Sequence, residues 1–143
     1  MYITKTAASK IDRTQILSTS YAFANGVYVF STIITSRLMD IYNNPTPENK
    51  KELKEVFWDN EVSHIEKIMK SFEPVLRALE SADEITKKSS RPLLLEDAEN
   101  ASKACDEIVV NPRSIGDMEL VNKINQLKVK IKGYCARIKN AVA

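Results

Sequence analysis

The only histidine of the chain, His64, lies in the segment NEVSHIEKIMKSF, and its neighbours are the first residues that could carry out chemistry. Glu61 precedes it by three residues, and two helical residues three apart share one face. Such an E-x-x-H pair is half of a di-iron carboxylate site, which needs a second pair and two further glutamates. The chain has one histidine and no glutamate within residues 10–42. We therefore expect no metal and no cofactor at His64.

His64 could also accept a phosphoryl group, because Lys67 follows it by three residues in the order H-x-x-K. Two features argue against this role. Ile68 stands where histidine phosphotransfer domains prefer glycine, and its bulk would obstruct a docking partner. His64 also falls on an apolar helical stripe, whereas a phospho-acceptor must be exposed. A histidine phosphotransfer-like bundle remains an alternative function.

The favoured interpretation of His64 is a partly buried ring whose nitrogens are hydrogen-bonded. A turn centred near Pro45 between two long helices places His64 level with Gly26. A glycine at that level leaves room for the ring, and Asn25 or Tyr28 could serve as its hydrogen-bonding partner.

The two cysteines, Cys105 and Cys135, suggest neither a disulfide nor a zinc site. With a helical turn near Ser114, Cys105 is level with about Lys123, and the two thiols are separated by roughly 18 Å along the helices. That separation is beyond the reach of a disulfide. We expect both cysteines to be small, buried core residues.

No motif for catalysis is found elsewhere in the sequence. The chain has no glycine-rich phosphate loop, no C-x-x-C and no nucleophile elbow. Its paired carboxylates, such as Asp83 with Glu84, are adjacent in sequence and therefore point apart on a helix. The expectation is a protein that is not an enzyme and has no catalytic residue, metal ligand or cofactor.

The elements that position these residues are predicted to be helices, because apolar residues recur with the 3.6-residue period. Clusters of Pro, Asn, Ser and Gly at 43–47, 87–92 and 111–117 predict the breaks between them. The expected fold is all-α: an antiparallel up-down bundle of about four helices, with the second helix kinked at Pro74. The expected helices cover residues 10–42, 47–86, 92–110 and 117–141. We expect one domain over 1–143, with a flexible segment at 1–9.

Composition indicates a globular helical protein rather than a strongly charged one. Of the 143 residues, 43% are hydrophobic and 28% charged, and the net charge of +2 does not by itself imply a nucleic-acid or membrane partner. The first residues contain no apolar signal segment, so we expect a cytoplasmic location. Residues 14–36 carry no charge and are long enough to cross a membrane, but many are polar. A buried helix is favoured there, and a membrane-active protein that inserts this helix is an alternative.

Two surfaces predict binding to another protein. The first helix is apolar around most of its circumference, so Val29, Phe30 and Ile33 are expected to contact a partner or a second copy of the chain. The outer face of the last helix is small and uncharged. Its candidate contact residues are Val129, Gly133 and Ala136.

The basic residues of the last helix have two interpretations. Lys128, Lys132 and Lys139 lie beside its apolar stripe and could contact nucleic acid or another anion. The helix before it is acidic, so pairing between the two helices is the favoured explanation. We therefore predict a small protein-interaction module, such as an inhibitor, immunity factor, adaptor or complex subunit. The alternative is a nucleic-acid-associated subunit.

Overall fold

The computed structural model describes residues 11–143 and shows an all-α protein, as the sequence predicted, with no β-strand in that part of the chain. The expected flexible segment at 1–9 lies outside the described residues. The elements are α2 (Arg13–Asn43), α3 (Pro47–Lys51), the π-helix η1 (Glu52–Val62), α4 (Ser63–Glu80), α5 (Glu84–Asp106), α6 (Pro112–Ile115) and α7 (Met118–Ala141).

Side-chain caps explain where most of these helices begin. Asp12 accepts a hydrogen bond from the backbone N–H of Gln15 at 2.9 Å, and the Gln15 side chain accepts one in return from the Asp12 N–H at 3.3 Å. Thr46, Asp83 and Asp117 cap α3, α5 and α7 in the same way, through the backbone N–H three residues later. Each such cap contributes about 1 kcal/mol to the stability of its helix.

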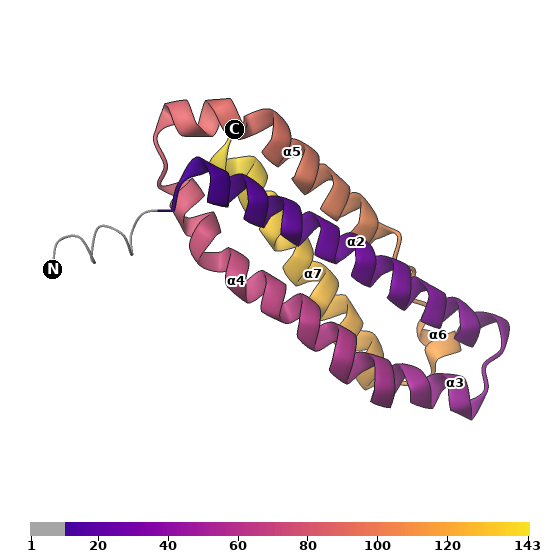
Figure 1. Ribbon diagram of the computed structural model, residues 1–143. Helices are drawn as coiled ribbons and strands as arrows, with labels where there is room; N and C mark the ends of the chain where they lie inside the picture. Colours follow the sequence, from indigo (N-terminus) through magenta and orange to yellow (C-terminus); the bar gives the residue numbers. More distant parts are fainter. Residues whose placement is uncertain (1–10) are drawn as a thin grey trace, which may run out of the picture.

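The predicted break at residues 87–92 is wrong. The chain instead breaks at residues 81–83, and α5 starts directly after its cap, Asp83, and continues through Pro92. A proline inside a helix removes one hydrogen bond and bends the helix rather than always ending it. Figure 1 shows α5 changing direction in its first half, where Pro92 lies. Leu94, fully buried just after the proline, helps to hold the bent helix in place.

The second predicted helix corresponds to three contiguous elements, α3, η1 and α4, and it ends at Glu80 rather than at residue 86. The kink expected at Pro74 stays a prediction. The α4 helix keeps its α-helical assignment across Pro74 from Ser63 to Glu80. The departure from α geometry is the π-helix η1, which spans 11 residues. A π-helix takes more residues per turn than an α-helix, so the residues that follow it are rotated relative to an α-helical count begun at Leu53.

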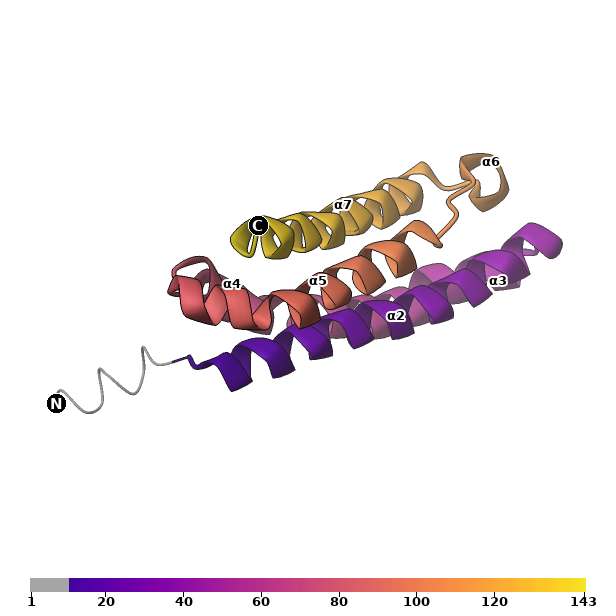
Figure 2. The same cartoon turned by 90° about the horizontal axis from the view of Figure 1, so that it is seen from above.

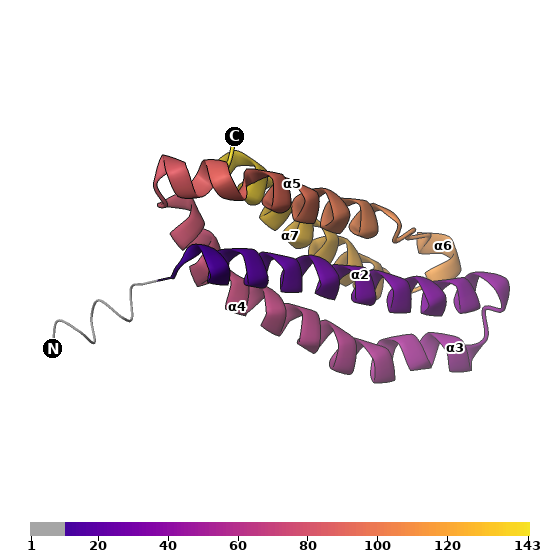
Figure 3. The same ribbon diagram turned by 45° about the horizontal axis from the view of Figure 1, so that its top comes forward.

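The helices α2 and α5 each pack along two other long helices. The helix α2 packs along α4 on one side and along α5 on the other, while α7 packs along α5 and meets α4. Figure 2 shows α2 and α7 on opposite sides of the molecule with α5 between them, and Figure 3 shows α2 between α5 and α4. Consequently, α5 runs along α2 and α7 rather than along α4, although only residues 81–83 separate α4 from α5.

Hydrogen bonds between α2 and α5 show that these two neighbours run in the same direction. Ser20 Oγ donates to Asp97 Oδ2 at 2.9 Å, and further along both helices Ser31 Oγ donates to the carbonyl of Ala104 at 2.5 Å. Both partners advance along the chain, so the helices are parallel. The expectation that neighbouring helices are antiparallel therefore does not hold for this pair.

Aromatic side chains join three helices at the centre of the apolar core. The ring centroids of Phe23 and Phe72 are 5.0 Å apart, and Tyr134 lies 5.7 Å from the first and 5.9 Å from the second. These distances are typical of favourable aromatic contacts. They tie α2, α4 and α7 together across the core.

Close packing of α4 on α2 depends on Gly26. A Cβ atom placed there would lie 2.8 Å from Ile68 Cδ1 and 3.5 Å from Ile65 Cδ1. At Gly133 on α7, a Cβ atom would meet nothing within 4 Å. The two helical glycines thus occupy opposite environments.

Leucine at these two positions should change stability in opposite directions. Gly26→Leu should lower the free energy of unfolding by about 1–3 kcal/mol, because the side chain has no room against α4. The matched variant Gly133→Leu should raise it by about 0.5–1 kcal/mol, because leucine favours a helix more than glycine does. Urea unfolding followed by circular dichroism measures both, and equal effects at the two positions would contradict the packing described for Gly26.

Candidate protein-docking surface

The solvent-exposed side of α2 has no charged residue between Arg13 and Arg37. Tyr21 and Tyr28 are its largest side chains, and they are 66% and 61% exposed. By contrast, the exposed positions of α5 include several charges. We call the uncharged surface the α2 face; its exposed residues are Thr14, Gln15, Ser18, Tyr21, Ala22, Asn25, Tyr28, Val29, Thr32 and Ser36.

The structure separates the three contact residues predicted on this helix. Val29 is 44% exposed and belongs to the α2 face. Ile33 is partly buried and packs against the core. Phe30 is only 3% exposed, so its expected position on the outer surface is wrong. Phe30 follows the buried Phe23 and Val27 at the i, i+4, i+7 spacing of one helical face, and that face points into the core.

The predicted surface of α7 is exposed but lies on the other side of the molecule. Val129 is 72% exposed, and Gly133 and Ala136 are also exposed. Because α2 and α7 lie on opposite sides (Figure 2), one flat partner surface cannot cover both. The two predicted surfaces are therefore separate candidates.

The three lysines considered for nucleic acid reach toward α5. Lys128 Nζ donates to the carbonyl of Ile108 at 2.6 Å, and Lys132 Nζ lies 2.9 Å from Asp106 Oδ1. Lys139 Nζ lies 3.5 Å from Glu99 Oε2. The hydrogen bond from Lys132 to Asp106 raises the pKa of that lysine. The contacts of Lys132 and Lys139 match the predicted pairing of the basic and acidic helices, whereas Lys128 bonds a backbone carbonyl just after α5.

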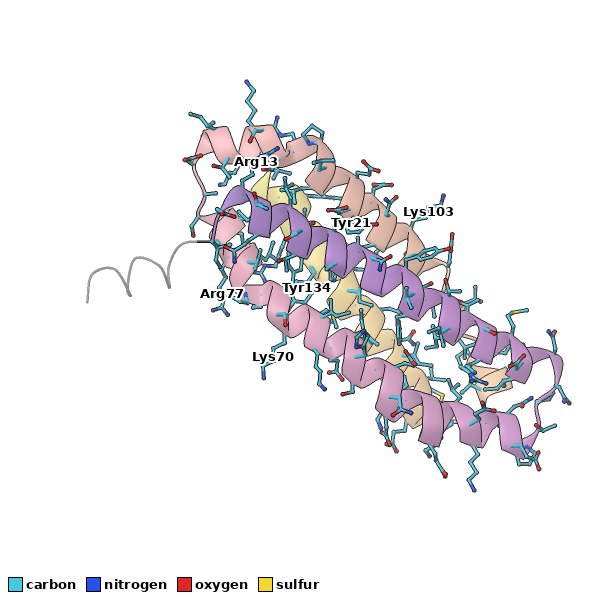
Figure 4. The ribbon with its side chains drawn as sticks, in the orientation of Figure 1. Arg13, Tyr21, Lys70, Arg77, Lys103 and Tyr134 are labelled. Atoms are coloured by element: carbon cyan, nitrogen blue, oxygen red, sulfur yellow. The ribbon has the colours of Figure 1, made fainter. Side chains whose placement is uncertain are left out.

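Arg137 connects α7 to α4 through two carboxylates. Its guanidinium donates to both oxygens of Glu73 at 2.8 Å and to the two oxygens of Glu80 at 2.7 and 3.1 Å. The hydrogen bonds from Arg137 lower the pKa of Glu80. The guanidinium also lies 5.8 Å from the ring centroid of Tyr134, which Figure 4 labels. This charge is used in the packing of helices and is not free for a ligand.

His64 is exposed, so the predicted partial burial is wrong. Its predicted level along α2 is right, because His64, Asn25 and Gly26 border one hollow of about 280 Å³. The space above Gly26 is filled by Ile65 and Ile68 instead of the imidazole. The π-helix η1 explains the difference, since it rotates His64 away from the stripe that an uninterrupted α-helix would give.

The cysteines are buried and free, but they lie closer together than the predicted register allowed. Cys105 Sγ lies 3.6 Å from the carbonyl oxygen of Lys128 rather than beside Lys123. Burial, and then the neighbouring Cys105, raise the pKa of Cys135 to about 11. The predicted turn near Ser114 was misplaced because residues 107–117, which include α6, carry the chain further before α7 starts.

Among residues 11–143, no three His, Cys, Asp or Glu side chains are grouped to hold a metal ion.

Within the described chain, no helix combines the length and apolar character that a membrane span needs. Comparisons with protein families, curated proteins and solved structures give no match for this chain.

Both thiols should react slowly in the folded protein. With a pKa of about 11, roughly one Cys135 thiol in a thousand is ionised at pH 8, and only the thiolate is nucleophilic. Alkylation by iodoacetamide at pH 8 should therefore be at least about 100-fold slower in the folded protein than in guanidinium chloride. Mass spectrometry of the modified protein over time measures this, with Cys135→Ser assigning the two sites. Equal rates in both conditions would show that the thiols are accessible.

Proposed function

We propose that this chain is a small, non-enzymatic protein-interaction module that binds a protein partner through the α2 face. The observation that carries this proposal is the absence of charge over the exposed side of α2 between Arg13 and Arg37. A helix that only faced water would gain solubility from charged side chains on that side. An uncharged helical face fits burial against another protein.

The composition of the α2 face supports tight helix packing. Tyr21 and Tyr28 can bury a large area at a small cost in side-chain entropy, and tyrosine is enriched among residues that dominate binding energy. Ala22 lies between the two tyrosines and Ser18 precedes them. Both side chains are small, so a helix of the partner can approach the backbone of α2 closely. Since no charge has to be removed from water, burying this face carries no ionic desolvation penalty.

The frame that we propose for this surface is a four-helix up-down bundle made of two antiparallel hairpins, α2 with α4 and α5 with α7. In that frame α2 is held from two sides, and its third side is presented rigidly. A rigid surface loses little conformational entropy on binding, which favours affinity. Inhibitor, immunity factor, adaptor and complex subunit are all roles that such a surface would serve.

A second copy of the chain is also a candidate partner. Two α2 faces packed on each other would give a closed dimer, because the same surface is used on both sides. An α2 face packed on the opposite α7 surface would instead give an open chain of molecules. The two arrangements are distinguishable by sedimentation.

The alternatives receive unequal support. The nucleic-acid alternative is weakened because Lys132 and Lys139 pair with acidic residues of α5 and Lys128 bonds the carbonyl of Ile108. The membrane-active reading is weakened because apolar residues of α2 such as Phe23 are in the core. A phosphotransfer role has one observation in its favour, namely the exposure of His64.

The variant Val29→Asp should abolish association while leaving the helices intact. It places a charge in the centre of the α2 face, and burying an unpaired charge costs several kcal/mol. The matched control is Val129→Asp, which makes the same change at an exposed position on the opposite side. A nuclease-treated pull-down, with stoichiometry from mass spectrometry, and sedimentation velocity measure association. Equal binding by both variants would remove the α2 face from the interface.

The variant His64→Gln should separate the phosphotransfer alternative from the proposed function. We expect a change in the free energy of unfolding within about 0.5 kcal/mol, since the substitution is at an exposed site. Association should be unchanged. Incubation of the unmodified chain with acetyl phosphate should leave no acid-labile phosphate on His64, as measured by mass spectrometry at neutral pH. A phosphorylated His64 would favour the alternative.

A further inference from the structure

A hollow of about 400 Å³ lies between α2 and α5, directly beside the α2 face. Tyr21 and Lys103, which Figure 4 labels, come from the two helices that border it. We call it the α2–α5 hollow; its polar and aromatic lining is Tyr21, Asn25, Tyr28, Asp97, Asn100 and Glu107, with Lys103 at α5.

The most informative residue of the hollow is Asp97. It is only 9% exposed, and its Oδ2 accepts a hydrogen bond of 2.9 Å from the fully buried Ser20. Among the ion pairs of residues 11–143, none involves Asp97. Burial raises the pKa of Asp97, and the nearby Glu96 raises it further. A carboxylate this buried is normally paired with a cation, so the hollow offers a charge that has no counter-ion within the described chain.

The walls of the hollow suit a flat cation. Tyr21 and Tyr28 are two helical turns apart on α2, roughly 10 Å along the axis, and both are mostly exposed at the hollow. A guanidinium stacks on aromatic rings and donates up to five hydrogen bonds in a planar fork, which matches a carboxylate. The amide oxygens of Asn25 and Asn100 supply further acceptors.

The charge balance of the hollow also favours a cation. Asp97 and Glu107 are acidic, and Lys103 is the basic residue of the lining. Glu107 is the C-cap residue of α5, and no ion pair of residues 11–143 joins Lys103 to Asp97. The buried carboxylate of Asp97 is left as the excess charge.

We propose that the α2–α5 hollow receives the guanidinium of an arginine side chain from the protein partner that docks on the α2 face. This inference rests on the proposed function, and it names the chemistry of the partner. Two features select a partner side chain as the occupant. The hollow shares Tyr21, Asn25 and Tyr28 with the α2 face, and its acidic groups complement a basic residue.

The first test is a titration with N-acetyl-L-arginine amide, followed by NMR on the ¹⁵N-labelled chain. The backbone amides around residues 21–28 and 97–104 should shift, with a dissociation constant of about 1–10 mM for one isolated side chain. N-acetyl-L-citrulline amide, which is similar in shape but neutral, should bind at least about fivefold more weakly. Equal shifts with both compounds, or none with arginine amide, would overturn the proposal.

The second test uses Asp97→Asn, which keeps an oxygen to accept the hydrogen bond from Ser20. This variant should weaken the binding of arginine amide at least about fivefold, whereas the exposed control Glu96→Gln should not. A thermal melt checks that the variant is folded. If it is not, Tyr28→Ala replaces it, because an exposed tyrosine can be removed without opening the core. Unchanged binding by the folded variant would contradict the assignment.

The third test separates this inference from the proposed function. Asp97→Asn should weaken association with the partner recovered by pull-down about tenfold, and Val29→Asp should abolish it. If Val29→Asp abolishes association but Asp97→Asn leaves it unchanged, the proposed function stands and the arginine site fails. If neither variant affects association, both proposals fail.

Discussion

The burial of α2 on two sides is the constraint on which the rest of this structure depends. A helix can pack closely against α4 and α5 at the same time only if the two sides that it buries carry no charged side chain. Residues 14–36 satisfy this condition, since they contain no charge. Gly26 brings α4 close on one side, and Ser20 and Ser31 hydrogen-bond to α5 on the other. The exposed side of α2, which carries the proposed binding surface, is formed by the same uncharged residues 14–36.

The features that could be predicted from the sequence are those controlled by local chemistry. Apolar periodicity indicated the all-α class, and the helix starts expected at residues 47 and 117 lie within one residue of the starts of α3 and α7, which Thr46 and Asp117 cap. The break near residues 87–92 could not be predicted well, because Lys, Ser and Arg all continue a helix and a proline can be tolerated within one. The cap Asp83 was the better signal for that boundary.

Errors in the predicted site have a common origin in helix register. The prediction placed His64 on the buried face because it assumed 3.6 residues per turn through residues 52–62. That segment is a π-helix, and no sequence pattern near it indicates one. The register of α5 and α7 failed for a similar reason, since the length of chain used by the turn was unknown. Phe30 differs, because its spacing from Phe23 and Val27 already indicated the core face. The contacts of Lys132 and Lys139, in contrast, followed from opposite charge on two helices.

The parallel contact between α2 and α5 has a consequence for how the chain folds. Its hydrogen bonds join residues 77 and 73 positions apart, whereas α2 meets α4 and α5 meets α7 across short turns. Closing a long loop costs more entropy than closing a short one, and non-local contacts slow folding. In the proposed arrangement, the hairpins α2 with α4 and α5 with α7 can therefore form before they dock along α2 and α5. Synthesis on the ribosome favours this order, because the segment of the first proposed hairpin emerges before that of the second.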